Sequence, residues 1–79
     1  MSNRQRYEKI FIDTFSIDAS ALVDDFVYNT IPEWDSIGHM GLIAAIEEAF
    51  GITMETDDII NFSSYKKGCE LLAKYGIEI

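Results

Sequence analysis

The sequence predicts an all-α fold, a small four-helix bundle with three main helices and a short third one. Apolar residues recur at spacings of three and four in several segments, as on the buried face of a helix. The chain has neither alternating strand patterns nor an Asn-Gly hairpin turn. Its 79 residues, 48% of them hydrophobic, are typical of one folded domain with a modest core. We therefore expect residues 1–79 to form a single domain.

The first helix is predicted for residues 3–15. Four apolar residues fall on one face of it: Tyr7, Ile10, Phe11 and Phe15. Residues 16–35 then lose this period and are rich in turn-forming residues. Because twenty residues are many for a loop in a compact domain, we expect this segment to be an ordered connector with a helical turn near residues 19–23. Five apolar side chains are expected to hold it to the core: Ile17, Leu22, Phe26, Tyr28 and Ile31.

A second main helix is predicted to begin near Ser36 and to end at Phe50. Its buried stripe consists of Leu42, Ile43, Ile46 and Phe50. Asp35 and Ser36 are both good N-cap residues, and Gly51 is a typical residue just beyond a C-terminus. At about 100° per residue, Ser36 falls on the side of Met40, Ala44 and Glu47, away from the stripe. Ser36 should therefore be exposed, beside a small apolar strip with an acidic edge.

Two further helices complete the predicted bundle. Thr56 can cap a short helix that carries Ile59, Ile60 and Phe62. Ser63 or Ser64 can cap the last helix, which ends near Gly76 and repeats apolar residues at Tyr65, Cys69, Leu72 and Ala73. Ile77 and Ile79 are expected to fold back on the bundle.

The charge distribution is strongly asymmetric. The chain has 14 acids and 6 bases, a formal net charge of -8, and residues 10–65 hold eleven acids and no base. Such a surface repels nucleic acid and anionic membranes, and it steers partners that carry basic patches. Mutual repulsion of this surface favours a monomer. The simpler alternative is that the acids only keep a small protein soluble.

Cys69, the one cysteine, excludes an internal disulfide or a cysteine-rich zinc site. Its helical spacing favours a small buried hydrophobe over a reactive thiol. The sequence has neither an apolar run of the roughly 20 residues that span a bilayer nor a signal-peptide core, so we expect a cytoplasmic protein. No spacing typical of a calcium loop or a zinc site is present, and no metal site is expected.

Ser36 is the main candidate for chemistry, and two interpretations are open from the residues alone. It can be a plain helix N-cap in an acidic protein-interaction module. It can be the nucleophile of a minimal hydrolase with His39, the one histidine, but no Gly-x-Ser-x-Gly elbow is present. The positive end of a helix also favours negative charge at this position. We expect His39 to lie half-buried at the edge of the core and the chain not to be an enzyme.

The motif Asp35-Ser36-Ile37, followed by Leu42 and by Glu47-Glu48, resembles the Asp-Ser-Leu motif of acyl carrier proteins. The resemblance covers nearly the whole chain, as a stand-alone carrier domain. It implies that a phosphopantetheinyl transferase, with magnesium, attaches 4′-phosphopantetheine from coenzyme A to Ser36. Asp35 then takes over the capping of the helix. The arm would carry acyl groups as thioesters to partner enzymes, which in this family contact positions matching Ile37, Met40, Glu47 and Glu48.

The sequence departs from the family pattern at two glycines. Gly38 and Gly41 stand where carriers of fatty acid synthesis commonly have acids, so fatty acid, polyketide and cell-surface polymer pathways all stay open. The cargo is equally open. The hypothesis for a short or medium acyl chain is shelter in the bundle core, among Leu42, Ile43, Ile46, Phe62 and Leu72.

Overall fold

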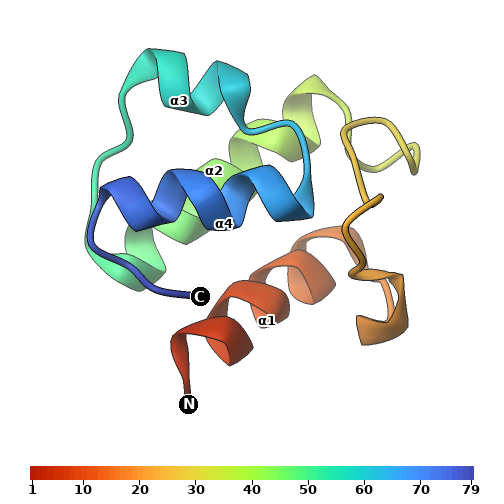
Figure 1. The fold of residues 1–79 in the computed structure, drawn as a ribbon. Helices are drawn as coiled ribbons and strands as arrows, with labels where there is room; N and C mark the ends of the chain where they lie inside the picture. The colour runs from red at the N-terminus through yellow and green to blue at the C-terminus, as the bar shows by residue number, and fades with distance from the viewer.

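The computed structural model describes residues 1–79 and is all-helical, with four α-helices and no strand. The helices are α1 (Asn3–Phe15), α2 (Ser36–Phe50), α3 (Thr56–Asn61) and α4 (Tyr65–Lys74), and a 3-10 turn, η1 (Ala19–Ala21), lies between α1 and α2. Figure 1 shows α2 and α4 crossing the middle of the molecule, with α1 on one side and the short α3 on the other. The expected small helical bundle is confirmed.

Side chains cap three of the four helix N-termini. Ser2 and Gln5 form a reciprocal capping box at α1, which was not predicted. Asp35 caps α2 and Ser64 caps α4, each by accepting a backbone N–H from the first turn. At the other end of α2, Gly51 has a left-handed φ of 65°, as predicted for a residue that ends a helix.

The prediction that Thr56 caps α3 is wrong. Glu55 occupies the N-cap position without a side-chain cap hydrogen bond, and Thr56 is the first helical residue. Asp57 and Asp58 lie in the first turn instead, where the helix dipole favours negative charge. In place of a cap, the start of α3 relies on the hydrogen bonds that Asp58 makes to α4 and the residue after it.

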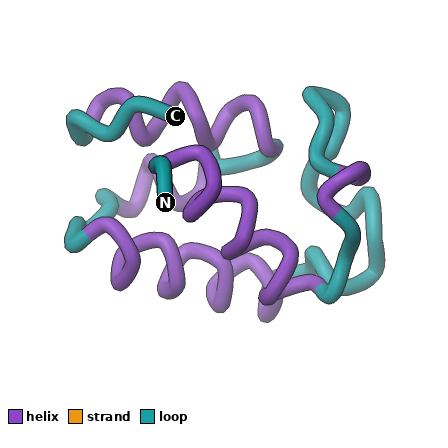
Figure 2. Tube along the Cα trace, turned by 90° about the horizontal axis from the view of Figure 1, so that it is seen from below, coloured by secondary structure: helices purple, strands orange, loops and turns teal.

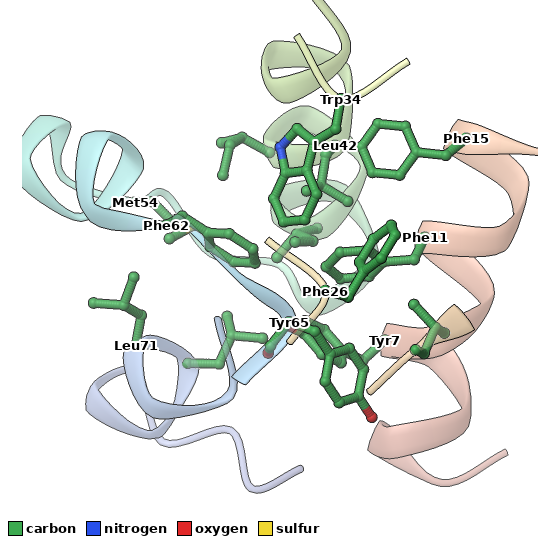
Figure 3. Packing of buried hydrophobic residues seen from close by; sticks show 14 of the residues in the cluster. Tyr7, Phe11, Phe15, Phe26, Trp34, Leu42, Met54, Phe62, Tyr65 and Leu71 are labelled. Atoms are coloured by element: carbon green, nitrogen blue, oxygen red, sulfur yellow. The ribbon is translucent and has the colours of Figure 1, made fainter. Parts of the chain in front are cut away.

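Phe11 of α1 lies at the centre of an aromatic core (Figure 3). Its ring centroid is 5.0 to 6.4 Å from those of Tyr7, Phe15, Phe26, Trp34, Phe62 and Tyr65. Edge-on packing dominates, as the quadrupoles of aromatic rings favour. The connector between α1 and α2 thus contributes Phe26 and Trp34 to the core. Both rings pack against Phe11 of α1, and the Phe26 carbonyl accepts a hydrogen bond from Tyr65 of α4.

Residues 16–35 pack along one end of the bundle (Figure 2). Leu22 and Phe26 are buried as predicted, and Ile17 and Ile31 are half-buried against the core. The prediction for Tyr28 is wrong, because its side chain is 37% exposed. Trp34, for which no burial was predicted, is fully buried and fills the core in place of Tyr28.

The connector is fixed to the start of α4 by backbone hydrogen bonds. The Tyr28 N–H donates to the Ser63 carbonyl at 2.8 Å, and the Tyr65 N–H donates to the Phe26 carbonyl at 2.9 Å. Val27 and Ser64 pair as an isolated antiparallel bridge. These bonds hold residues 26–28 close to the junction between α3 and α4.

The two chain ends lie near each other (Figures 1 and 2). The Asn3 side-chain amide donates to the Glu78 carbonyl at 3.2 Å, and Ile77 is buried. The expectation that the C-terminal residues fold back is confirmed. None of the helices combines the length and the apolar character needed to cross a membrane.

Candidate functional site

Ser36 is the first residue of α2 and is exposed, as predicted. Of the two cap candidates, the structure uses Asp35, whose Oδ1 accepts the Gly38 N–H at 2.8 Å. The Ser36 hydroxyl is therefore not needed to cap the helix. It is accessible for chemistry while the helix start stays intact.

The backbone around Ser36 retains donors. The N–H groups of Ser36 and Ile37 donate to no acceptor in the protein, whereas those of Gly38 and His39 bond to Asp35. Unpaired N–H groups in a first turn carry the positive end of the helix dipole. An anionic group attached to Ser36 would meet these donors.

A groove of about 500 Å³ opens beside Ser36. It lies between the start of α2, the short α3 and the connector, and its walls are Tyr28, Ser36, His39, Met40, Ile59, Ile60, Phe62 and Ser63. Met40, Ile59 and Ile60 make much of this surface apolar, and three hydroxyl-bearing residues add polar groups. It is the one pocket of the structure.

The bundle core, where shelter for an acyl chain was expected, contains no open cavity. Leu42, Ile43, Ile46, Phe62 and Leu72 are at most 1% exposed and enclose no pocket. Close packing of aliphatic and aromatic side chains fills that space. Only Phe62 belongs to both the core and the groove, so the room for a ligand lies at the surface between α2 and α3.

Tyr28 lies over Ser36. The two hydroxyl oxygens are 3.3 Å apart, within hydrogen-bond distance. The Tyr28 ring packs edge-on against Trp34 and His39, with centroid separations of 6.2 and 5.8 Å. No local pattern predicts this contact, because Tyr28 belongs to a segment without periodicity.

His39 is half-buried at the edge of the core, as predicted, and does not bond to Ser36. The Trp34 indole N–H donates to Nδ1 at 3.1 Å, and Nε2 lies 2.8 Å from the Ile59 carbonyl. Because an indole nitrogen only donates, Nδ1 is the acceptor and Nε2 carries the proton. His39 thus joins the connector, α2 and α3 in one fixed tautomer, with neither nitrogen directed to Ser36.

Gly38 is required by the close approach of the preceding chain. A Cβ atom there would collide with the Glu33 backbone carbonyl and crowd the Phe15 ring. A Cβ at Gly41 would meet nothing within 4 Å. Of the two glycines in α2, only Gly38 therefore has a steric reason to be glycine.

The residues assigned to the partner surface by resemblance divide into two groups. Ile37, Met40 and Glu48 are exposed, Ile37 at 84% and Met40 at 57%. Glu47 is half-buried, and its Oε2 accepts the Met54 N–H at 2.8 Å. Glu47 therefore holds the segment that leads from α2 to α3.

A second polar cluster holds the first turn of α3 by hydrogen bonds. Asp58, 5% exposed, accepts from Lys74 Nζ at 2.7 Å and from the Tyr75 hydroxyl at 2.5 Å. The Tyr75 oxygen in turn accepts the Glu55 N–H at 3.0 Å. The Lys74 bond, followed by the Tyr75 bond, lowers the pKa of the Asp58 carboxyl below its usual value. Nowhere in the chain do three side chains of metal-ligating type come together.

Cys69 is half-buried and packs against the core rather than lying fully inside it. Burial raises the pKa of its thiol, and the nearby Tyr7 hydroxyl opposes this shift. A thiol with a raised pKa holds less reactive thiolate, which is in keeping with a packing role.

Comparison with known protein families and curated proteins identifies no relative of this chain. No protein-family model matches the chain, and no curated protein matches it closely enough to indicate common descent. The resemblance of the Asp35-Ser36-Ile37 motif therefore stays a prediction that depends on the residues and on their geometry.

Proposed function

We propose that this chain is a stand-alone acyl carrier protein with an acyl-carrier-like helical fold, and that Ser36 bears 4′-phosphopantetheine. One observation carries the proposal. Ser36 presents an exposed hydroxyl at the first position of α2 while the neighbouring Asp35 caps the helix. A serine needed only as a cap would occupy the position that Asp35 holds.

The surroundings of Ser36 fit a phosphodiester. The free N–H groups of Ser36 and Ile37 and the positive end of α2 stabilise negative charge there. When bound, the arm supplies a terminal thiol that carries acyl groups as thioesters. The chain's own residues would bind the phosphodiester, and the groove between Met40, Ile59 and Ile60 gives apolar cargo a surface beside the attachment point.

The attachment needs a separate enzyme. The Ser36 oxygen attacks the β-phosphorus of coenzyme A, the new Oγ–P bond forms, and adenosine 3′,5′-bisphosphate leaves. The Ser36 proton must pass to a base, but both His39 nitrogens are held by Trp34 and Ile59. A transferase with a bound magnesium ion would supply the base and the charge stabilisation.

The acidic surface supports repeated, reversible docking. Residues 10–65 hold eleven acids and no base, and α2 exposes Ile37 and Met40 near its start and Glu48 in its last turn. Apolar side chains beside acids form a surface that a basic patch with an apolar centre would fit. A flexible arm then raises the effective concentration of the cargo at each partner enzyme.

The proposal is tested by incubating the protein with coenzyme A, magnesium and a broad-specificity phosphopantetheinyl transferase. We expect the intact mass to increase by one phosphopantetheine, and Ser36→Ala to show no increase. An acidic protein-interaction module would gain nothing in either form. A serine hydrolase would turn over an activated ester without the transferase, and this activity would disappear in Ser36→Ala.

A further inference from the structure

We propose that Tyr28 is a positioning residue for the Ser36 modification. Its hydroxyl orients the Ser36 oxygen before the arm is attached and donates a hydrogen bond to the phosphodiester afterwards. The inference rests on the proposed function and adds to it a residue eight positions before the serine, outside the motif. The observation that carries it is the 3.3 Å separation of the two hydroxyl oxygens.

Tyr28 is held in place by contacts that do not involve Ser36. Its backbone N–H donates to the Ser63 carbonyl at 2.8 Å, and the adjacent Val27 pairs with Ser64. Its ring lies edge-on to Trp34 and His39. Because Trp34 is fully buried and His39 is bonded at both nitrogens, the ring rests on a rigid support. The Tyr28 hydroxyl is thus presented to Ser36 at a small cost in conformational entropy.

Modification of Ser36 fixes the direction of this hydrogen bond. In the unmodified protein either hydroxyl can donate. As a phosphoester, the Ser36 oxygen has no proton, so Tyr28 becomes the donor and faces an anionic group. A hydrogen bond to an ionised acceptor is shorter and stronger than one between neutral groups. Tyr28 therefore binds the modified form better than the unmodified one.

The groove offers a matched control. Ser63 lines the same pocket as Tyr28 and Ser36, and its side chain has no hydrogen bond to either. Tyr28→Phe removes one hydroxyl and keeps the ring on Trp34 and His39. Ser63→Ala likewise removes one hydroxyl from the groove. Any effect of polarity in the groove as a whole would appear in both variants.

The test compares the intact chain with these two variants. Each is loaded by the transferase, and the ³¹P NMR resonance of the phosphodiester is recorded together with kcat/KM for loading. We expect Tyr28→Phe to shift the resonance and to lower kcat/KM about fivefold, the effect of one lost hydrogen bond. Ser63→Ala should match the unchanged protein in both measurements. Circular dichroism checks that all three are folded.

An unchanged resonance in Tyr28→Phe would overturn the proposed bond to the phosphodiester, and unchanged kcat/KM would overturn the orienting role. Equal effects in Ser63→Ala would overturn the assignment to Tyr28. These results require that the unchanged protein accepts the arm. If it does not, the proposed function itself fails, and this inference fails with it.

Discussion

Gly38 shows how one backbone contact restricts a residue at the proposed attachment site. Its Cα approaches the Glu33 carbonyl so closely that a β-carbon has no room, although the residue lies within a helix. Glycine costs a helix about 1 kcal/mol relative to alanine. At Gly38 this cost permits the chain before Asp35 to pack against the first turn of α2.

The two glycines of α2 give opposite predictions. We expect Gly38→Ala to lower the free energy of unfolding by about 1–3 kcal/mol, because the new methyl group displaces the Glu33 backbone. Gly41→Ala should raise it by roughly 0.5–1 kcal/mol, because that site is open and helical. Urea unfolding followed by circular dichroism measures both. Equal effects of the two substitutions would contradict the close approach at Gly38.

His39 is predicted to stabilise the fold rather than to act as a base. In His39→Phe a phenyl ring takes the place of the imidazole ring. The indole N–H of fully buried Trp34 then loses its acceptor. An unsatisfied buried donor costs about 1–3 kcal/mol, so the free energy of unfolding should fall by that amount. Thermal or urea unfolding measures the change. A variant as stable as the unchanged protein would disprove the Trp34–His39 bond.

Sequence reasoning predicted side-chain positions best where a period exists, although the burial of Leu22 and Phe26 in the connector was also expected. The exposure of Ser36 and the half-buried position of His39 follow from helical geometry, and both are confirmed. The burial of Trp34 and the exposure of Tyr28 were not predicted, because residues 16–35 have no period from which a face can be inferred. The contact between Tyr28 and Ser36 depends on backbone pairing with the start of α4, which no local pattern encodes.

At the scale of the element, α3 is the helix that depends most on its neighbours. It has six residues and no side-chain cap, so it cannot be stable alone. Asp58 joins its first turn to Lys74 and Tyr75, and Ile59 accepts from His39 near its other end. Since Ile59 and Ile60 form part of the groove wall, these bonds also fix the shape of the groove.

The attachment of α3 should depend on pH through Asp58. The carboxyl has a lower pKa in the folded protein than its ordinary value of about 3.9, so folding favours the ionised form. This contribution is fully present above about pH 5 and is lost as the pH falls through the folded pKa. Asp58→Asn should therefore weaken the loss of stability between pH 5 and pH 2, in comparison with the unchanged protein. The free energy of unfolding across this range measures it.

Asp57→Asn is the matched control for this experiment, because Asp57 is exposed in the same turn, whereas Lys74 and Tyr75 donate their hydrogen bonds to Asp58. It should keep the pH dependence of the unchanged protein. If Asp58→Asn and Asp57→Asn behave alike, the Asp58 cluster does not hold α3.

The helices themselves were predictable because caps and apolar periods agree in them. The start of α2 at Ser36 and its end at Phe50 were both expected, and Ser64, which caps α4, was one of its two expected caps. The cap of α3 was misassigned to Thr56, since a local cap signal competes there with the tertiary bonds of Asp58. The groove was missed, because it depends on where α3 lies relative to α2.

On the scale of the whole molecule, charge is the property most relevant to function. The net charge is -8, and the bases lie only near the two ends of the chain. A hydrogen bond between Asn3 and Glu78 holds those ends together. A strong one-sign surface accelerates encounters with an oppositely charged partner, and salt screens this effect.

The rate of loading should accordingly depend on salt. From about 0.01 to about 0.1 M ionic strength the Debye length falls from about 30 to about 10 Å, and we expect kcat/KM for the transferase to fall about tenfold. Glu48→Gln, at an exposed position of α2, should lower kcat/KM and weaken the salt dependence. Glu78→Gln, an exposed acid near the C-terminus, should do neither. A kcat/KM that is constant or rises with salt would exclude electrostatic steering.

We propose that Ser36, and no other serine, receives the phosphopantetheine arm. The chain has six serines, at positions 2, 16, 20, 36, 63 and 64, so the claim can be tested within one molecule. The most direct measurement is fragment-ion mass spectrometry of the protein after incubation with coenzyme A, magnesium and the transferase. We predict one added phosphopantetheine, located on Ser36 alone. No added mass, or an added mass on another residue, would show that Ser36 is not the attachment site.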